Sequence, residues 1–324
     1  MNIGVIPENV YKRSVAKYSG ALRSDLFADT KVKDDCAYLA LTEGTTVASC
    51  SMELISKELP FTAIYTVVNR LSAGGSEPLG LTVSIVYPLT SEEEEIKENM
   101  KQLDSLCKEL HLSILSSQVS SGAFVNHPIL FVTALGIPLE KEKFLSKAVP
   151  GNDCVLTSHI GLSGTSIIAR TKEQELLEKF PSKMIYDSRN FHRLLSTIHE
   201  AAPAIKSGVT AMYALSEGGI FSGLWKMAES SGVGLEINLR HIPIKQETIE
   251  ICNVYDLNPY LLHSLGCTLM TTSDGNKLVM DLAKEGIEAT IIGKITDSND
   301  RVLINGDIRR FLDLPKQDEL FKII

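Results

Sequence analysis

Apolar residues in the N-terminal half of the chain form runs with helical spacing and shorter runs rich in β-branched residues. The helical runs predict a buried helix over 61–73 and an amphipathic helix over 91–111. Ser91 and Glu94 have the spacing of a capping box at the start of the second helix. Strands are expected at 36–41, 46–49, 81–87, 112–115 and 129–137.

The second half repeats this mixed pattern after a charged stretch bounded by prolines. That stretch covers 138–150, and a boundary there divides the chain into domains 1–148 and 149–324. Helices are expected over 171–180, 188–205, 246–255 and 274–285, and strands over 154–158, 209–214, 235–239, 268–272, 288–295 and 301–304. Asn305-Gly306 predicts a type I′ hairpin turn. The alternation indicates two α/β domains with mixed sheets.

A glycine pair, Gly218-Gly219, lies between the expected strand 209–214 and an apolar helical face that begins at Ile220. Glycines at a strand-to-helix turn let backbone N–H groups approach an anion, and the helix dipole favours negative charge there. Phosphate sites are often built in this way. The same pair also permits a tight turn and close packing without a ligand, and the segment alone slightly favours this second interpretation.

Composition is that of a soluble globular protein, with 44% hydrophobic and 22% charged residues among 324. The net charge of -8, without a basic stripe carrying interleaved aromatics, argues against a nucleic-acid partner. No signal-peptide core stands near the N-terminus, and no apolar run reaches the ~18 residues that a membrane span needs. We therefore expect a cytoplasmic protein with neither a membrane nor a nucleic acid as partner.

The six cysteines and seven histidines are scattered along the chain. They form no CxxC, HxH or HExxH spacing and no mixed cluster. This distribution argues against both a disulfide framework and a structural zinc site.

Several short motifs occur in order, each weak alone but specific in combination. They are Asp34-Asp35-Cys36-Ala37, residues 69–79, Gly161-Leu162-Ser163-Gly164-Thr165, Ser216-Glu217-Gly218-Gly219, Asn258-Pro259-Tyr260 and residues 264–269. With them the chain resembles the AIR synthase-related superfamily over nearly its whole length. The superfamily includes aminoimidazole ribonucleotide synthase, selenophosphate synthetase, thiamine-monophosphate kinase and the hydrogenase-maturation factor HypE. The resemblance is closest to the HypE-like branch.

The resemblance implies an N-terminal α/β domain that pairs with its twin in a homodimer and closes a shared β-barrel. A C-terminal α/β domain would pack beside it. Family members bind ATP and magnesium in a cleft near the dimer interface and phosphorylate an amide- or acid-type oxygen. Holding a triphosphate in this way requires several carboxylates that bind divalent ions between protein and nucleotide.

Much of that acidic set is missing from this chain. The family's Asn-Asp corresponds to Asn69-Arg70, and its His-Asp to Tyr213-Ala214. The aspartate that the family has after its second strand would fall in residues 49–52, which contain no acidic residue. Residues 116–120 lack the family's Gly-Gly-His-Thr-Glu. Asp34, Asp35, Asp153 and Glu217 survive, and Asp34 and Asp35 are the residual metal-ligand candidates.

The exchange at Arg70 changes the local charge by two units. The interaction energy of two unit charges about 4 Å apart is roughly 4 kcal/mol at an effective dielectric of 20. We therefore expect magnesium-dependent phosphoryl transfer of the family's usual kind to be absent or badly impaired.

Two interpretations remain. The favoured one is a degenerate, non-catalytic member that keeps the fold and the dimer, needs no cofactor, and has a binding or assembly role. The alternative is an ATP- and magnesium-dependent enzyme in which Arg70 contacts phosphate as a fixed cation. Its nucleotide- or phosphate-binding candidates would be Arg70, Gly161, Gly164, Thr165, Glu217, Gly218 and Gly219.

Simpler roles exist for two of these candidates. A salt bridge from Arg70 to Asp34 or Asp35 is favoured over phosphate binding, and Glu217 can serve as an acid at a helix start. The resemblance also assigns HypE a carbamoylated cysteine at its extreme C-terminus. Since the last cysteine here is Cys267, we do not expect that reaction.

Overall fold

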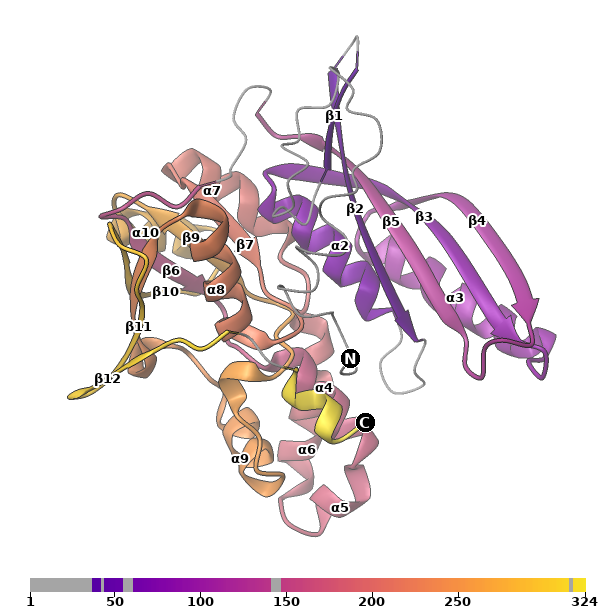
Figure 1. Ribbon diagram of the computed structural model, residues 1–324. Helices are drawn as coiled ribbons and strands as arrows, with labels where there is room; N and C mark the ends of the chain where they lie inside the picture. The colour runs from indigo at the N-terminus through magenta and orange to yellow at the C-terminus, as the bar shows by residue number, and fades with distance from the viewer. Residues whose placement is uncertain (1–36, 42–43, 55–60, 141–146, 315–316) are drawn as a thin grey trace.

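The computed structural model describes residues 37–41, 44–54, 61–140, 147–314 and 317–324. It has a mixed α/β fold of two domains, each built on one mixed sheet (Figure 1). The strand order is β1-β2-β5-β3-β4 in the N-terminal sheet and β12-β11-β8-β10-β6-β9-β7 in the C-terminal sheet. The expectation of two mixed sheets is confirmed. Asp34 and Asp35 lie outside the described residues.

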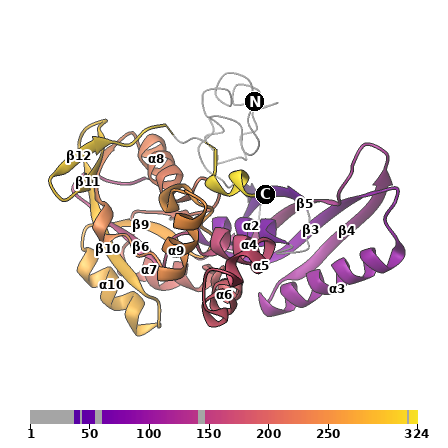
Figure 2. The ribbon, with the colours of Figure 1, turned by 90° about the horizontal axis from the view of Figure 1, so that it is seen from below.

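The N-terminal sheet is covered by helices on one face. It consists of β1 (Ala37–Leu41), β2 (Gly44–Leu54), β3 (Ser76–Pro88), β4 (Ser113–Gly122) and β5 (Ile129–Pro138). Only β3 and β4 pair in parallel among the described strands of this sheet. Val83 and Val132 pack with Val67 of α2 (Thr62–Ala73) and Leu103 of α3 (Glu93–Glu109). Figure 2 shows α3 running along this face.

Within the described ranges, the C-terminal sheet has seven strands, against five in the N-terminal sheet, and helices cover both of its faces. Its strands are β6 (Asp153–Thr157), β7 (Ala211–Ala214), β8 (Gly234–Asn238), β9 (Thr268–Thr272), β10 (Ala289–Thr296), β11 (Arg301–Asn305) and β12 (Ile308–Phe311). β8 and β11 pair in parallel, and the other pairs are antiparallel.

Helix α8 (Gly219–Ser231) on one face and helices α7 (Ala201–Ser207) and α10 (Gly275–Lys284) on the other bury the apolar residues of this sheet. Helices α4 (Leu162–Thr171), α5 (Glu173–Leu177), α6 (Ser182–Arg189) and α9 (Gln246–Val254) pack on one another in a separate cluster. Leu224 of α8 packs in one cluster with Leu156, whereas Leu278 of α10 packs in another with Val155. Neighbouring residues of β6 therefore face opposite layers, as the strand pleat requires.

Helix α2 also joins the two domains. The side-chain amide of Asn69 donates to the carbonyl of Leu195 at 2.7 Å and accepts from the backbone N–H of Thr197 at 2.9 Å. The hydroxyl of Ser72 donates to the carbonyl of Thr197 at 3.2 Å. All of these contacts are buried, so Asn69 of the 69–79 motif holds the domains together.

The predicted helix over 188–205 is wrong. Helix α6 ends at Arg189, and the 3-10 turns Asn190–Leu194 and Ile198–Glu200 precede α7. The backbone groups of Leu195 and Thr197 bind Asn69 and Ser72 of α2 instead of forming a helical ladder.

Three local predictions also need correction. Helix α3 has Glu92 as its N-cap, without a side-chain cap bond, so the predicted capping box at Ser91 does not form. Helix α4 ends at Thr171, where a helix was expected to begin. In the β11–β12 hairpin, Gly306 has a positive φ of 62° but Asp307 does not, whereas a type I′ turn needs both.

None of the helices in the described part of the chain combines the length and the apolar character that crossing a bilayer requires.

Candidate functional site

Residues 258–266, here called the connecting loop, hold together the two glycine turns found in the sequence. The backbone N–H of Gly164 donates to the carbonyl of His263 at 3.0 Å, and that of Gly161 donates to the hydroxyl of Ser264 at 2.8 Å. The N–H of Ser264 in turn donates to the carbonyl of Ser216 at 3.1 Å. The starts of α4 and α8 therefore lie side by side, although they are far apart in the sequence.

The turn before α8 depends on both of its glycines. Gly218 and Gly219 have left-handed φ values of 79° and 60°. A Cβ atom on Gly219 would lie 2.6 Å from the carbonyl oxygen of Tyr260 and 2.8 Å from that of Leu262. The close approach of the connecting loop therefore accounts for the glycine pair without any ligand.

The amide groups of this turn already have partners within the chain. The N–H of Gly218 donates to Oδ2 of Asp318 at 2.6 Å, and the N–H of Gly219 donates to the carbonyl of Ser216 at 3.2 Å. Asp318 comes from the C-terminal end and caps α8, whose N-cap residue, Gly218, has no side chain. A carboxylate thus occupies the position where the sequence suggested an anion.

The Asp318 carboxylate is almost fully buried, with 2% of the residue exposed. Its Oδ1 accepts the backbone N–H groups of His263 at 3.1 Å and Leu320 at 2.8 Å. Burial raises the pKa of Asp318 to about 6, and the three N–H donors act against that rise.

The α4 turn is also closely packed. A Cβ atom on Gly161, which has a φ of 76°, would lie 2.8 Å from Cγ2 of Thr248, and one on Gly164 would lie 2.5 Å from Cγ of Leu262. The hydroxyl of the fully buried Thr165 donates to that of Thr248 on α9 at 2.9 Å. The side chain of Thr165 is therefore directed into the core.

Sequence reasoning missed an imidazole held in one orientation. Oγ of the fully buried Ser163 lies 2.7 Å from Nδ1 of His263 and donates to the carbonyl of the same residue at 3.0 Å. It also accepts the N–H of Leu265 at 2.9 Å. The contact between Oγ and Nδ1, together with the bonds of Ser163 to the backbone on both sides of the ring, fixes the orientation of the imidazole.

Charges from both domains act on His263. Removal of the ring from water lowers its pKa to about 4, the negative charge of Glu217 opposes this shift, and the positive charge of Arg70 adds to it. Nη1 of Arg70 also donates to the carbonyl of Cys50 at 3.2 Å. The structure therefore brings Arg70 of α2 near the turn that carries Glu217.

The other surviving acid of the sequence motifs has a structural partner elsewhere. Oδ2 of Asp153 accepts the N–H of Gly275 at the start of α10 at 3.0 Å. Among the residues that the structure describes, no group of three or more His, Cys, Asp or Glu side chains could hold a metal ion.

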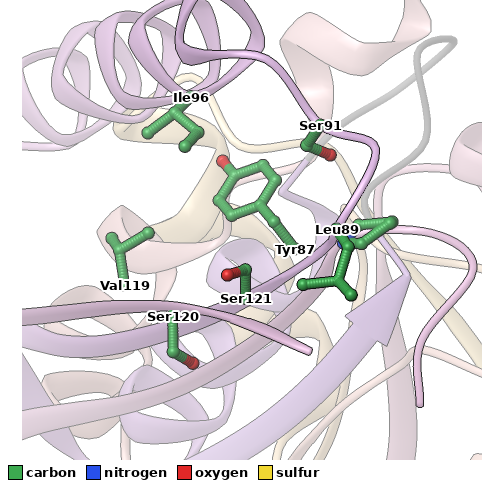
Figure 3. Close-up of a pocket in the computed structure, with 8 residues that line it drawn as sticks. Tyr87, Leu89, Ser91, Ile96, Val119, Ser120 and Ser121 are labelled. Atoms are coloured by element: carbon green, nitrogen blue, oxygen red, sulfur yellow. The ribbon is translucent and has the colours of Figure 1, made fainter. Parts of the chain in front are cut away.

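A surface pocket of about 270 Å³ lies apart from these residues, between the start of α3 and the end of β4 (Figure 3). Tyr87 lies in it between Ile96 and Val119, and its hydroxyl accepts from Nδ2 of Asn99 at 3.1 Å. The pocket contains none of the phosphate- or metal-binding candidates, although Val119 and Ser120 of the 116–120 segment line it.

Comparison with known families gives a clear result. The model of the AIR synthase related protein N-terminal domain matches residues 31–138, and that of the C-terminal domain matches residues 149–305. The chain belongs to the AIR synthase-related superfamily. The predicted family is therefore confirmed.

Relatives of this AIR synthase-related chain include hydrogenase-maturation proteins. A Methanocaldococcus jannaschii protein named for hydrogenase expression and formation is 25% identical over 267 residues, which are 81% of this chain and 77% of that protein. The carbamoyl dehydratase HypE of Rhodobacter capsulatus is 24% identical over 268 residues, which are 80% and 75% of the two chains.

Solved structures of the superfamily have the same fold. A chain from a crystal structure of a HypE–HypF complex has a TM-score of 0.72 at 19% identity, covering 88% of this chain and 95% of that one. HypE in complex with ATP gives a TM-score of 0.71 at 16% identity, with coverages of 89% and 90%. At these identities the likeness concerns the fold alone.

Proposed function

We propose that this HypE-like chain is a non-catalytic member of the superfamily, with a binding or assembly role in place of magnesium-dependent ATP chemistry. The observation that carries the proposal is the bond between the N–H of Gly218 and the carboxylate of Asp318. A triphosphate approaching this turn would meet a buried carboxylate that already holds the amide. Like charges about 4 Å apart repel by roughly 4 kcal/mol at an effective dielectric of 20.

The position of Arg70 supports the same proposal. Its charge acts on His263 beside the glycine turns, where the family resemblance leads us to expect an aspartate that binds metal. A fixed cation there would repel a divalent ion. The HypE–HypF complex supports a binding role by analogy, since it is a HypE assembled with another protein.

We further propose a homodimer formed through the N-terminal domain, with the domain boundary at 148/149. No helix in the described part of the chain covers the second face of the N-terminal sheet. Met52 of β2 and Phe131 of β5 lie on this face as neighbours across the two strands. They are 62% and 44% exposed. A twin sheet would bury this apolar face, and the sheets on either side of residue 148 support the boundary.

One observation favours the alternative of an ATP-dependent enzyme with Arg70 as a phosphate contact. The guanidinium lies close enough to the α8 turn to act on His263, and a HypE of the same fold has been solved with ATP. In that case Asp318 would have to leave the Gly218 amide before phosphate could bind.

Calorimetric titration with ATP, with and without magnesium, distinguishes the two proposals. We expect no magnesium-dependent binding to the wild type. The triple variant Arg70→Asp, Ala214→Asp, Asp318→Ala should gain such binding, because it restores two acids and removes the carboxylate that holds the Gly218 amide. Arg193→Asp changes an exposed arginine and should not. A micromolar, magnesium-dependent Kd for the wild type would overturn the non-catalytic proposal.

A further inference from the structure

The C-terminal residues 317–324, here called the strap, return to the turn before α8 and to the connecting loop. In Figures 1 and 2 this segment lies beside α4. It lies beyond the residues 149–305 that the C-terminal family model matches.

Two adjacent carboxylates attach the strap to different backbone segments. Asp318 accepts from Gly218 in the turn before α8 and from His263 in the connecting loop. Glu319, which is 7% exposed, accepts the N–H of Asn258 at the other end of that loop at 3.2 Å. Nζ of Lys322 donates to the same Glu319 oxygen at 2.5 Å and compensates its charge.

Apolar packing holds the strap between these two attachments. Leu320 is buried in a cluster with Leu262 of the connecting loop, Leu176 of α5 and Ile185 of α6. The strap therefore has both directional bonds and a buried anchor, which together fix its position.

The contacts of the strap meet at the loop on which both glycine turns depend. The connecting loop supplies the partners of the Gly161 and Gly164 amides and approaches Gly219 closely. The turn before α8 has no side-chain cap of its own and takes it from Asp318. Neither segment keeps all of its hydrogen bonds without the strap.

We propose that the C-terminal strap sets the conformation of the two glycine turns, because Asp318 and Glu319 hold the α8 turn and the connecting loop in one unit. Release of the strap then loosens both segments together. Coupling of this kind is reciprocal, so anything that orders the connecting loop also protects the strap. This conformational role does not depend on whether the glycine turns bind a nucleotide.

Hydrogen exchange measured by mass spectrometry on the full chain tests the proposal. In Asp318→Ala we expect amides in 218–222 and 258–265 to exchange at least about tenfold faster, while β3 and β5 keep wild-type rates, because local exchange follows the local opening free energy. Asp313→Ala, which removes an exposed aspartate just before the strap, is the matched control and should change neither segment.

Asp318→Asn and Glu319→Gln extend the test if Asp318→Ala fails to fold. Each keeps one carbonyl acceptor, and each should accelerate exchange in both 218–222 and 258–265 by a smaller factor. Faster exchange confined to the strap itself, or in only one of the two segments, would overturn the proposal. Neither result bears on magnesium-dependent ATP binding, so this proposal and the proposed function can fail separately.

Discussion

At the scale of single residues, the buried carboxyl group of Glu200 has a measurable effect on stability. The residue is 8% exposed, and its Oε2 accepts the hydroxyl proton of Thr157 at 2.9 Å. Burial raises the pKa of Glu200 to about 7, although the hydrogen bonds with Thr268 and Thr157 act to lower it. The folded protein therefore binds this proton more tightly than the unfolded chain does.

The sign of the pH dependence follows from that difference. The protonated Glu200 contributes to the free energy of unfolding. This contribution is complete below about pH 4.5 and is lost as the pH rises through about 7, which lowers the free energy of unfolding by an amount on the order of 3 kcal/mol. Glu200→Gln should therefore be more stable than the wild type at pH 8, with a flatter profile.

Urea unfolding at a series of pH values measures this effect. His263 has the opposite dependence, because its lowered pKa removes stability as the pH falls from about 6.5 toward 4. Because the wild type and Glu200→Gln both contain His263, the difference between their profiles from pH 4.5 to 7 reports on Glu200. Glu288→Gln changes an exposed carboxylate and is the control. Parallel profiles for Glu200→Gln and the wild type would contradict the prediction.

At the scale of elements, helix α4 is determined by what packs on it. Glycine and serine at 161–166 lower its helical propensity, and the sequence pattern predicted a helix that begins at Thr171. The helix forms because Leu262 packs directly against Gly164 and the connecting loop binds the amide there.

Gly164→Ala should therefore destabilise the protein by about 1–3 kcal/mol, even though alanine is the better helix former. The added methyl group would lie 2.5 Å from Cγ of Leu262. In a Leu262→Ala background the cost should largely disappear. A double-mutant cycle by chemical denaturation measures this coupling.

Thr171→Ala, at the exposed end of α4, is the control in the same helix. An equal cost of Gly164→Ala in both backgrounds would indicate that contact with Leu262 is not the reason for the glycine.

At the scale of the whole molecule, the uncovered face of the N-terminal sheet predicts the dimer interface. Met52→Glu combined with Phe131→Glu would bury charges in that interface and should convert a dimer into a monomer. Size-exclusion chromatography with light scattering measures the mass, and circular dichroism tests the fold.

Met280→Glu places the same charge on an exposed residue of α10 in the other domain and should leave the dimer intact. A wild-type monomer at micromolar concentration would contradict the proposed homodimer. A double variant that remains dimeric would place the interface on another surface.

Local patterning by itself determined the two mixed sheets and the positions of the glycine turns, and the resemblance of the motifs gave the superfamily. Helical spacing and strand-like runs depend only on neighbouring residues, and a motif can be read wherever its residues are consecutive. Arg70 and Glu217 were likewise identified from motifs, and the structure brings their charges to one histidine.

Only the tertiary structure decided what those elements bind. The break in the helix predicted over 188–205 comes from Asn69, 126 positions from Leu195, and the cap of α8 comes from Asp318, 100 positions from Gly218. His263 is oriented by Ser163, also 100 positions away. Because folding alone creates such contacts, no local pattern identified Asp318 or His263 as neighbours of the glycine turns.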